Sequence, residues 1–283
     1  MSNYFGDAVI VATFGSADDN VRKIFDALVA DVRQSFPTFE VRTAFTSNFM
    51  IRKLARRNVF VPTVAEEISN LRGEGFRRIF VLPTLLTAGE EFDNKIRPCA
   101  TINKVECNVE LKLSSGNPNC SAASKAAAAG DVEIISPLLS DDCSTAFDRK
   151  VFATVLDCYP HADDETLILV GHGSPHRHNP TFASLQRLAG DKILIGVIEP
   201  TGTPNFDDVV AKLPHATKIF LAPLLFNGGV HVNEDIAVTW RNRLTALGHQ
   251  VRVSTVGLGA FESFRNLYVE KLREVICHGR TQD

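Results

Sequence analysis

The chain has 283 residues, 45% of them hydrophobic and 22% charged, with a formal net charge of −3 at pH 7. These values are typical of an ordinary globular protein with one large or two medium domains, and the lack of a basic stripe or of about 18 consecutive apolar residues argues against a nucleic-acid partner and a membrane span. The six cysteines are too few for a disulfide scaffold, no signal peptide precedes the first apolar run, and we expect a cytoplasmic protein.

Apolar runs, each bounded by Gly, Pro or Asp, recur along the chain. They lack the polar alternation of strands with one exposed face, which indicates parallel strands covered by helices on both faces. Helical patterns lie between the runs, and this alternation predicts an α/β fold with doubly wound parallel sheets. In chain order the eight predicted strands are 8–14, 39–45, 78–86, 132–138, 166–171, 193–199, 217–226 and 250–256.

Three of the helical patterns can be bounded from the sequence. An apolar stripe runs from Val21 to Val32. Thr63 and Glu66 form a capping box, which predicts that the next helix begins there. A further apolar stripe predicts a helix over 233–247.

The sequence repeats itself around two predicted strands. Residues 79–96 (IFVLPTLLTAGEEFDNKI) align without a gap with residues 219–236 (IFLAPLLFNGGVHVNEDI). In that register Glu91 falls on His231, so the two copies keep their scaffold and differ at an ionisable side chain.

A second repeat follows the first strand of each half. VATFGS at 11–16 aligns with LVGHGS at 169–174, which pairs Phe14 with His172 inside a shared Gly-Ser frame. Two copies of one ancestral design that differ in a few side chains point to an asymmetric site between them.

A third match extends the repeat to four strands in each half, because 132–139 (VEIISPLL) aligns with 251–258 (VRVSTVGL). Each half is therefore predicted to be a small doubly wound domain. The first domain is predicted to span 1–140 and the second 141–283.

Residues 100–130 have no counterpart in the second half. They include the low-complexity run SAASKAAAAG, and we interpret them as a surface insertion. Cys99, Cys107 and Cys120 cluster there, but their spacing matches neither a CxxC pair nor a common zinc pattern, so we interpret them as incidental thiols.

Two helical stretches follow the last strand of each half. The stretch 143–159 is expected to cross from the first half to the second. By the repeat, 261–277 is its counterpart and is expected to pack back on the first half.

The divergent positions share a place in the predicted fold. Open parallel sheets bind ligands beyond the carboxyl ends of their strands, and Phe14, His172, Glu91 and His231 all follow strands there. If the halves face each other across a pseudo-twofold axis, these positions line one cleft. Two imidazoles and a carboxylate are a plausible ligand set for Fe²⁺, Co²⁺, Ni²⁺ or Zn²⁺. A neutral histidine can also accept a proton near neutral pH.

The loop GHGSPHRHN around His172 admits other interpretations. Gly171 and Gly173 are expected to let a flat ligand approach the backbone closely. The loop is not a phosphate-binding loop, because neither GxxxxGK[ST] nor GxGxxG is completed. Ser174 does not lie in a GxSxG nucleophile motif, which argues against a serine hydrolase. His176 offers a further imidazole, which could serve the cleft or be a solvated loop residue.

The candidate residues also have structural interpretations. A lone histidine after a strand often bonds only to backbone. Glu91 and its neighbour Glu90 could be charges that favour the N-terminus of a helix. The repeat favours functional roles for His172, His231 and Glu91, because all three occupy repeat-equivalent loops.

Motifs along nearly the whole chain resemble one family, the anaerobic cobalt chelatases, which are class II tetrapyrrole chelatases that act on sirohydrochlorin. The resemblance implies two lobes with the macrocycle in the cleft between them, and insertion of Co²⁺ with release of two protons on the anaerobic route to cobalamin. It implies no organic cofactor, and some relatives accept Fe²⁺ and can serve sirohaem synthesis. The motifs are GHGSPH after a strand, AFTSNFMIRKL at 44–54, LLTAGEEFDNKI at 85–96 and LLFNGGVHVNEDI at 224–236.

The resemblance also implies roles for residues. His172, His231 and Glu91 match the family's metal-handling residues and are expected to bind the metal and to carry the catalysis. The substrate's carboxylates need donors at the rim, while Phe14 is expected to press against the macrocycle. The expected substrate-binding residues are Phe14, Ser16, Ser47, Arg52, Gly89 and His176, of which Ser16, Ser47 and Arg52 are chosen from their location and not from the resemblance. Arg177 follows His176 where the family often has an adjacent histidine.

Two alternatives stay open. One is ferrochelatase-type insertion of Fe²⁺ for sirohaem or haem, and the other is a non-catalytic carrier of a tetrapyrrole or metal. The choice between Co²⁺, Fe²⁺ and Ni²⁺ cannot rest on affinity, since the usual order of divalent affinities does not favour Co²⁺ over Ni²⁺. The sequence leaves the oligomeric state open, and a homo-oligomer is compatible with it.

Overall fold

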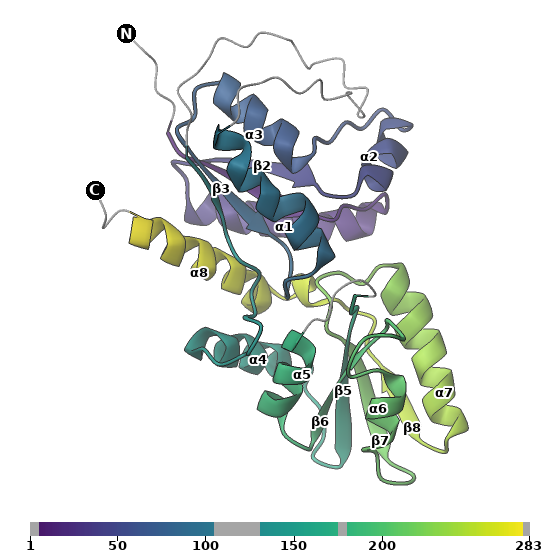
Figure 1. Ribbon diagram of the computed structural model, residues 1–283. Helices are drawn as coiled ribbons and strands as arrows, with labels where there is room; N and C mark the ends of the chain where they lie inside the picture. Colours follow the sequence, from purple (N-terminus) through teal and green to yellow (C-terminus); the bar gives the residue numbers. More distant parts are fainter. Residues whose placement is uncertain (1–5, 105–130, 175–179, 280–283) are drawn as a thin grey trace. The chain divides into compact units, whose positions relative to one another are not determined.

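The computed structural model describes residues 6–104, 131–174 and 180–279. The chain forms two compact units, each with its own four-stranded sheet (Figure 1). The first unit comprises Met1–Leu85, Glu91–Ser136 and Tyr268–Asp283, and the second comprises Leu86–Glu90 and Pro137–Leu267. The sequence division at 140/141 differs from this one at three segments, 86–90, 137–140 and 268–283, which group with the opposite unit.

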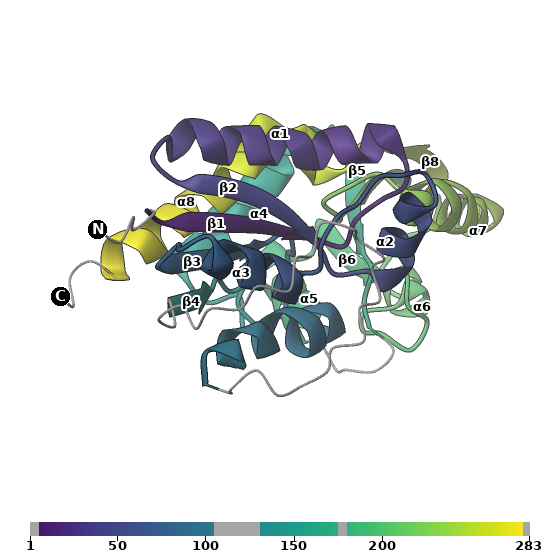
Figure 2. The ribbon, with the colours of Figure 1, turned by 90° about the horizontal axis from the view of Figure 1, so that it is seen from above.

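The sheet of the first unit is entirely parallel. All six residues of its central strand β1 are buried, because helices cover both faces. Figure 2 shows α1 and α3 on opposite faces of this sheet. Across the sheet the strands are β2 (Glu40–Phe45), β1 (Ala8–Thr13), β3 (Arg78–Pro83) and β4 (Asp131–Ile134). The helices are α1 (Asp19–Ser35), α2 (Asn48–Ala55), α3 (Val64–Gly73), the π-helix η1 (Phe92–Ile96) and the 3-10 helix η2 (Arg97–Lys104).

The second unit repeats this topology. Its strands run in parallel in the order β6 (Ile193–Val197), β5 (Glu165–Gly171), β7 (Lys218–Pro223) and β8 (Gln250–Val253). Its helices are α4 (Ala146–Cys158), α5 (Pro180–Ala189), α6 (Phe206–Val210), the π-helix η3 (His231–Trp240), α7 (Arg241–Ala246) and the 3-10 helix η4 (Leu258–Ala260). Helix α8 (Glu262–Gly279) begins in this unit and continues in the first from Tyr268.

The predicted α/β class and the two parallel sheets are confirmed, and each predicted strand coincides with an observed one. Several predicted strands extend beyond the ends of the observed strands. The strands β3 and β7 end at Pro83 and Pro223, whereas 78–86 and 217–226 were expected. The apolar run continues because the loops beyond these strands are themselves buried, as Leu86 and Leu224 show.

Two of the predicted helix signals are present as expected. The apolar stripe of α1 is buried from Val21 to Val32. At the start of α3 the Thr63 hydroxyl accepts from the Glu66 backbone N–H, and the Glu66 carboxylate accepts from the Thr63 backbone N–H. This reciprocal cap satisfies two amide groups that have no partner within the helix.

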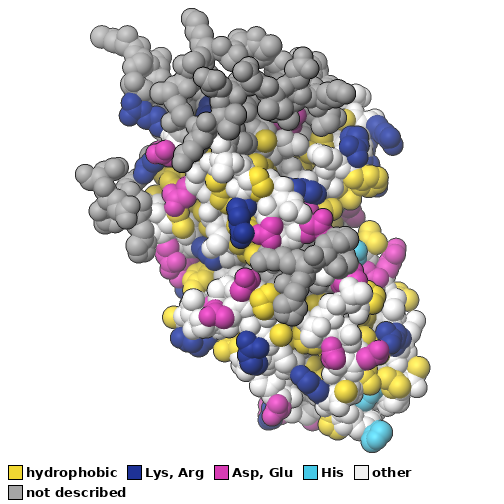
Figure 3. Space-filling view, viewed as in Figure 1, with side chains coloured by type: hydrophobic (Ala, Val, Ile, Leu, Met, Phe, Trp, Pro, Cys, Tyr) yellow, Lys and Arg dark blue, Asp and Glu magenta, His cyan; other side chains and the backbone are white. Residues whose placement is uncertain are grey.

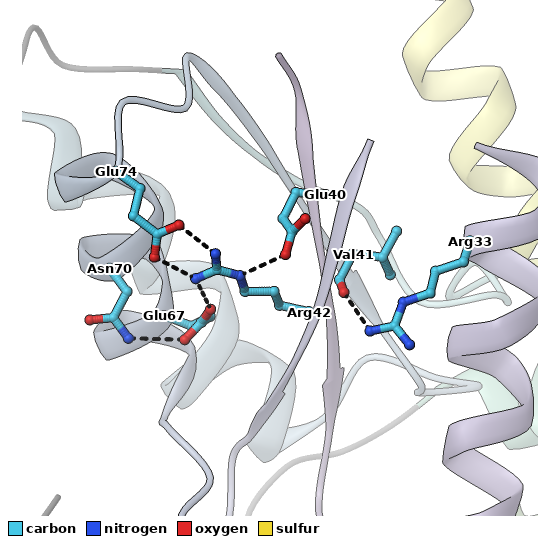
Figure 4. A network of polar contacts seen from close by, with 7 residues as sticks. All are labelled: Arg33, Glu40, Val41, Arg42, Glu67, Asn70 and Glu74. Carbon is cyan, nitrogen blue, oxygen red and sulfur yellow. Dashed lines mark hydrogen bonds and ion pairs between the residues drawn. The ribbon is translucent and has the colours of Figure 1, made fainter. Parts of the chain in front are cut away.

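A polar network ties α3 to the edge strand of the first sheet (Figure 4). Arg42 on β2 donates to Glu40, Glu67 and Glu74, and the hydrogen bond to Glu74 leads the interactions that raise the pKa of Arg42 above its usual value. Glu67 is only 4% exposed, and it also accepts from Asn70 over 3.0 Å. A buried carboxylate held by several donors is stable only while they remain, so Arg42 fixes the position of α3.

Helix α4 and the later part of helix α8 each come after the last strand of one sheet but belong to the unit that contains the other sheet. Helix α4 follows β4 but groups with the second unit, where the Tyr159 hydroxyl lies 2.9 and 2.8 Å from the carbonyl oxygens of Pro223 and Val256. The later part of α8 groups with the first unit, where Arg273 lies 5.7 Å from the Phe36 ring centroid. The expected return of the C-terminal helix to the first half is therefore present.

The face of the molecule seen in Figure 3 carries charges of both signs. In Figure 3 the basic and acidic side chains are interspersed, and no stripe of one sign crosses the face that is shown. Among the described residues, no helix combines the length and the hydropathy that a membrane crossing needs. The cytoplasmic location expected from the sequence stays a prediction.

Candidate functional site

Two histidines of the second unit lie together at the carboxyl edge of its sheet. His172 directly follows β5, and His231 begins η3 after the loop that leaves β7. Their ring centroids are 4.6 Å apart and the rings are nearly perpendicular, at 88°. The structure thus brings together the two imidazoles that the repeat singled out, as expected from neighbouring parallel strands.

Hydrogen bonds fix which ring nitrogen of each histidine is free. His172 Nδ1 lies 2.9 Å from the Gly173 carbonyl oxygen, and His231 Nδ1 lies 2.8 Å from Asp235 Oδ2. Both oxygens can only accept, so each Nδ1 carries the hydrogen and each neutral ring keeps its lone pair on Nε2. Metal-binding histidines are commonly oriented in this way, with the second nitrogen donating to a carbonyl or carboxylate. Neither Nε2 has a hydrogen-bond partner within 6–104, 131–174 and 180–279, so both can bind a metal or accept a proton.

His231 lies at the start of a π-helix, which the sequence analysis predicted only as an ordinary helix. The π-helix η3 passes into α7 at Arg241. Its buried residues Val232, Ile236 and Trp240 recur every four positions, so they share one face of the helix. π-helices are rare, and they occur frequently at functional sites. A four-residue apolar spacing fits an α-helix about as well, so the sequence contains no signal that separates the two kinds of helix.

Glu91 of the first unit directly precedes the other π-helix, η1, and has a basic partner. The Lys95 Nζ lies 3.1 Å from Glu91 Oε1 and 3.0 Å from Oε2, so the ammonium bridges both carboxylate oxygens. The same Nζ lies 6.0 Å from the ring centroid of Phe14, which follows β1 and is 46% exposed. Lys95 therefore joins Phe14 and Glu91 within the first unit.

The two units use the same geometry with opposite charges. In the register of the repeat, Glu91 falls on His231 and Lys95 falls on Asp235, so each π-helix carries an i,i+4 pair. In the first unit the acid precedes the base, and in the second the order is reversed. Sequence analysis found Glu91 and His231 but missed Lys95 and Asp235, although the same alignment contains them.

Backbone contacts hold Phe14 and His172 in equivalent places. The Phe14 carbonyl accepts from Ser47 N over 3.2 Å, and the His172 carbonyl accepts from Glu199 N over 2.9 Å. In both units the loop after the first strand is thus tied to the loop after the second. The repeat has preserved the backbone of this loop while its side chain changed from a phenyl to an imidazole.

The glycines of the histidine loop serve the protein's own packing. Gly173 has a φ angle of +79°, and its repeat equivalent Gly15 has a φ angle of +91°. This left-handed backbone conformation favours glycine. A Cβ at Gly171 would lie 2.3 Å from a ring carbon of Phe182. The expected role of Gly171 and Gly173 in ligand approach is therefore not needed to explain them.

The other predicted substrate-binding residues differ in whether their side chains already have hydrogen-bond partners within the protein. The Ser47 hydroxyl caps α2 by accepting from Met50 N, and the residue is only 5% exposed. The Ser16 hydroxyl accepts from Asp18 N, whereas Arg52 is exposed on α2 and has no ion-pair partner among the described residues.

A Cβ added at Gly89 would meet nothing within 4 Å, so this position is open. His176 lies outside the described residues, as do Cys107 and Cys120. Contact of any of these residues with a substrate stays a prediction.

The ionisable residues limit what kind of metal site each unit could form alone. Within the described part of either unit, no three His, Cys, Asp or Glu side chains form a group that could hold a metal. Burial raises the pKa of the Cys99 thiol to about 11 and leads the effects that raise that of Cys143 to about 12, so neither offers a thiolate at neutral pH. The second unit thus brings two imidazoles together, and a third ligand of these residue types would have to come from elsewhere.

Comparison with known proteins identifies relatives over nearly the whole chain. The family model "Cobalt chelatase (CbiK)" matches residues 7–277. The sirohydrochlorin cobaltochelatase CbiKC of Nitratidesulfovibrio vulgaris is 23% identical over 282 residues, which cover 95% of this chain and 90% of the relative. The sirohydrochlorin cobaltochelatase of Salmonella typhimurium is 22% identical over 280 residues, covering 95% and 96% of the two chains.

Solved structures with a similar fold include two of SirB. SirB from Bacillus subtilis with Fe³⁺ has a TM-score of 0.65 at 15% identity, and the match covers 98% of both chains. The sirohydrochlorin chelatase SirB from Bacillus subtilis subspecies spizizenii in complex with cobalt has a TM-score of 0.59 at 14% identity, covering 95% of this chain and 94% of that one. At these identities the likeness concerns the fold.

Proposed function

The chain belongs to the cobalt chelatase (CbiK) family, and on this premise we propose that it is an enzyme that inserts Co²⁺ into sirohydrochlorin, with release of two protons, on the anaerobic route to cobalamin. The names of both sequence relatives support this substrate and this metal. The observation that carries the proposal is the perpendicular pair of His172 and His231, each with Nδ1 hydrogen-bonded and Nε2 left free.

The two imidazoles suit both tasks of the reaction. Their Nε2 atoms bind a divalent ion while water fills its remaining positions, and the ion then passes to the pyrrole nitrogens. Insertion displaces two N–H protons, and a neutral imidazole accepts a proton at physiological pH. The carboxylate of Asp235 stays hydrogen-bonded to His231 Nδ1 in either protonation state, so it offsets the positive charge that the ring gains.

Glu91 is proposed as the third ligand, and this role rests on its repeat equivalence to His231. A carboxylate beside two imidazoles offsets the charge of the divalent ion during transfer. Phe14 is proposed to pack against the macrocycle, since an exposed phenyl ring offers a flat apolar surface. Arg52 is the proposed donor to the substrate's carboxylates, together with Ser16, whereas the capping role of Ser47 makes its hydroxyl a weaker candidate.

The first prediction concerns the histidines. His172→Ala and His231→Ala each remove one metal ligand and one proton acceptor, so we expect the rate of Co²⁺ insertion to fall about 100-fold or more. The rate is measured from the change in the absorption spectrum of sirohydrochlorin. The matched control is His215→Ala, which removes an exposed histidine three residues before β7, at the opposite edge of the sheet. Full activity in either site variant would contradict the proposal.

Two alternatives have clear experimental signatures. A carrier of the same ligands binds sirohydrochlorin and Co²⁺ but makes no more than one product per protein, so a multiple-turnover assay separates it from an enzyme. Fe²⁺ insertion is separated by the same assay run side by side with Co²⁺, Fe²⁺ and Ni²⁺. Affinity alone does not decide among these ions, because the general order of divalent affinities places Ni²⁺ above Co²⁺.

A further inference from the structure

Lys95 has no part in the function proposed above, yet its ammonium contacts the proposed metal ligand. We propose that Lys95 is a displaceable counter-ion that occupies the Glu91 carboxylate when no metal is bound and returns to it when the metal leaves. The inference rests on the proposed function, because it assumes that Glu91 binds the divalent ion. In this role Lys95 competes with the divalent ion for the Glu91 carboxylate, so that the carboxylate holds the ion only transiently.

The geometry places the ammonium where a metal would bind. Lys95 Nζ lies within 3.1 Å of both carboxylate oxygens of Glu91, and no side chain stands between them. A divalent ion bonds to a carboxylate oxygen at about 2 Å, so it would use the same lone pairs and would repel the ammonium. Binding of the metal and binding of Lys95 to Glu91 therefore exclude or weaken each other.

The displaced ammonium has a second binding place within reach. The Phe14 ring centroid is 6.0 Å from Nζ, near the limit at which a cation is attracted to an aromatic face. Lys95 is 43% exposed, and its flexible four-carbon stem allows the head group to move without any change in the backbone. The ammonium can thus leave Glu91 and remain beside it.

The second unit shows why this competition is distinctive. Its repeat-equivalent partner, Asp235, binds Nδ1 of His231 and leaves Nε2 free, so it prepares the ligand for metal. Lys95 occupies the ligating atoms of Glu91 themselves, so it opposes metal binding. A protein that must give its metal away gains from this opposition, since a tighter site would retain the ion.

The test is Lys95→Met, which keeps an unbranched side chain one heavy atom shorter and removes its charge. Isothermal titration of Co²⁺ into the full-length metal-free protein, without tetrapyrrole, is expected to show a Kd about two- to fivefold lower, as estimated from the strength of exposed ion pairs. Lys95→Arg keeps the charge and should retain a Kd near that of the unmodified protein. The matched control is Lys218→Met, which removes an exposed lysine paired with Asp164 at the start of β7 and should leave the Kd unchanged.

Two further measurements separate a counter-ion from a structural role. In a Glu91→Gln background, Lys95→Met should have no further effect on the Kd, because the competition acts through the carboxylate. In turnover assays Lys95→Met should lower both the KM for Co²⁺ and kcat, because the metal binds more tightly and leaves more slowly.

The outcomes distinguish this inference from the proposed function. If Glu91→Gln weakens Co²⁺ binding but Lys95→Met leaves the Kd unchanged, the counter-ion role is wrong and the chelatase proposal stands. If Glu91→Gln itself leaves Co²⁺ binding unchanged, Glu91 is no ligand and the inference is overturned. The chelatase proposal itself is contradicted by other results, namely full insertion activity in the histidine variants or a lack of multiple turnover in the unmodified protein.

Discussion

Asp235 and Lys95 fill the same position in two copies of one helix and act on their neighbours in opposite ways. Asp235 accepts from His231 Nδ1 and so selects the tautomer in which Nε2 can bind a metal. Lys95 covers both oxygens of Glu91. Changes at two repeated positions have thus given one histidine whose Nδ1 is hydrogen-bonded to a carboxylate and one carboxylate that is covered by an ammonium.

Asp235 gives a prediction at this scale. Asp235→Ala should lower Co²⁺ affinity and insertion rate by about 10- to 100-fold, since partners that orient a metal-binding histidine commonly have effects of that size. The ring nitrogen resonances of His231 in NMR spectra should show a mixture of tautomers, which a purely structural role would not produce. The control is Asp164→Ala, an exposed acid at the opposite edge of the sheet. Unchanged His231 resonances together with an unchanged rate would refute this role.

At the scale of elements, strands were predictable and π-helices were not. Buried parallel strands are continuous apolar runs, which located the inner strands, although buried loops after Pro83 and Pro223 extended two runs beyond the strand ends. The edge strands β4 and β8 instead alternate between exposed and half-buried residues, contrary to the expectation that helices cover both faces of every strand. The π-helix η3 was predicted as an ordinary helix, because an apolar stripe constrains the buried face more than the bond pattern. The sequence did not single out the i,i+4 pairs Glu91–Lys95 and His231–Asp235, because charged pairs at this spacing are common on the surface of ordinary helices.

An ion pair across the second sheet gives a prediction about pH. Arg252 on β8 donates to Glu165 on β5 and lies over the Phe220 ring of the intervening β7, 3.4 Å from its centroid. The hydrogen bond from Arg252, followed by one from the Ala162 backbone, lowers the pKa of Glu165 from its usual value near 4.5 to about 2. Because the folded-state pKa lies below the unfolded one, the pair stabilises the fold above pH 4.5, and this stabilisation is lost as the pH falls towards 2.

Arg252→Met should therefore flatten the loss of stability between pH 4.5 and about 2, as followed by urea denaturation at a series of pH values. Lys218→Met provides the comparison, because its partner Asp164 is 62% exposed and the pair contributes little. If the free energy of unfolding falls as steeply with decreasing pH in Arg252→Met as in the unmodified protein, other carboxylates control the acid sensitivity.

At the scale of the whole molecule, the repeat made the fold and the candidate histidines predictable. It placed His172 and His231 on neighbouring strand ends, where they are found 4.6 Å apart. It also led to the expectation that the C-terminal helix returns to the first half. The contact-based units group 86–90, 137–140 and 268–283 with the opposite half, and spatial contacts of this kind leave no periodic trace in the sequence.

The returning helix gives the last prediction. Leu272 in α8 is fully buried and belongs to the first unit, so Leu272→Ala should lower the free energy of unfolding by about 2–5 kcal/mol. Urea denaturation measures this loss, with the exposed Leu247→Ala as a control that should change stability little. A change below about 0.5 kcal/mol for Leu272→Ala would show that the helix end does not contribute to the core.

The crossing of α4 and α8 bears on the ancestry of the chain. Each follows the last strand of one half, yet α4 and the later part of α8 belong to the opposite unit. A primitive chain with a single copy of the repeat would leave its own sheet without that covering helix. Two such chains would complete each other by trading it, as in a domain-swapped homodimer. Fusion of the two genes would then have allowed the partners to diverge, which is how one copy could acquire imidazoles while the other kept a phenyl ring and a carboxylate.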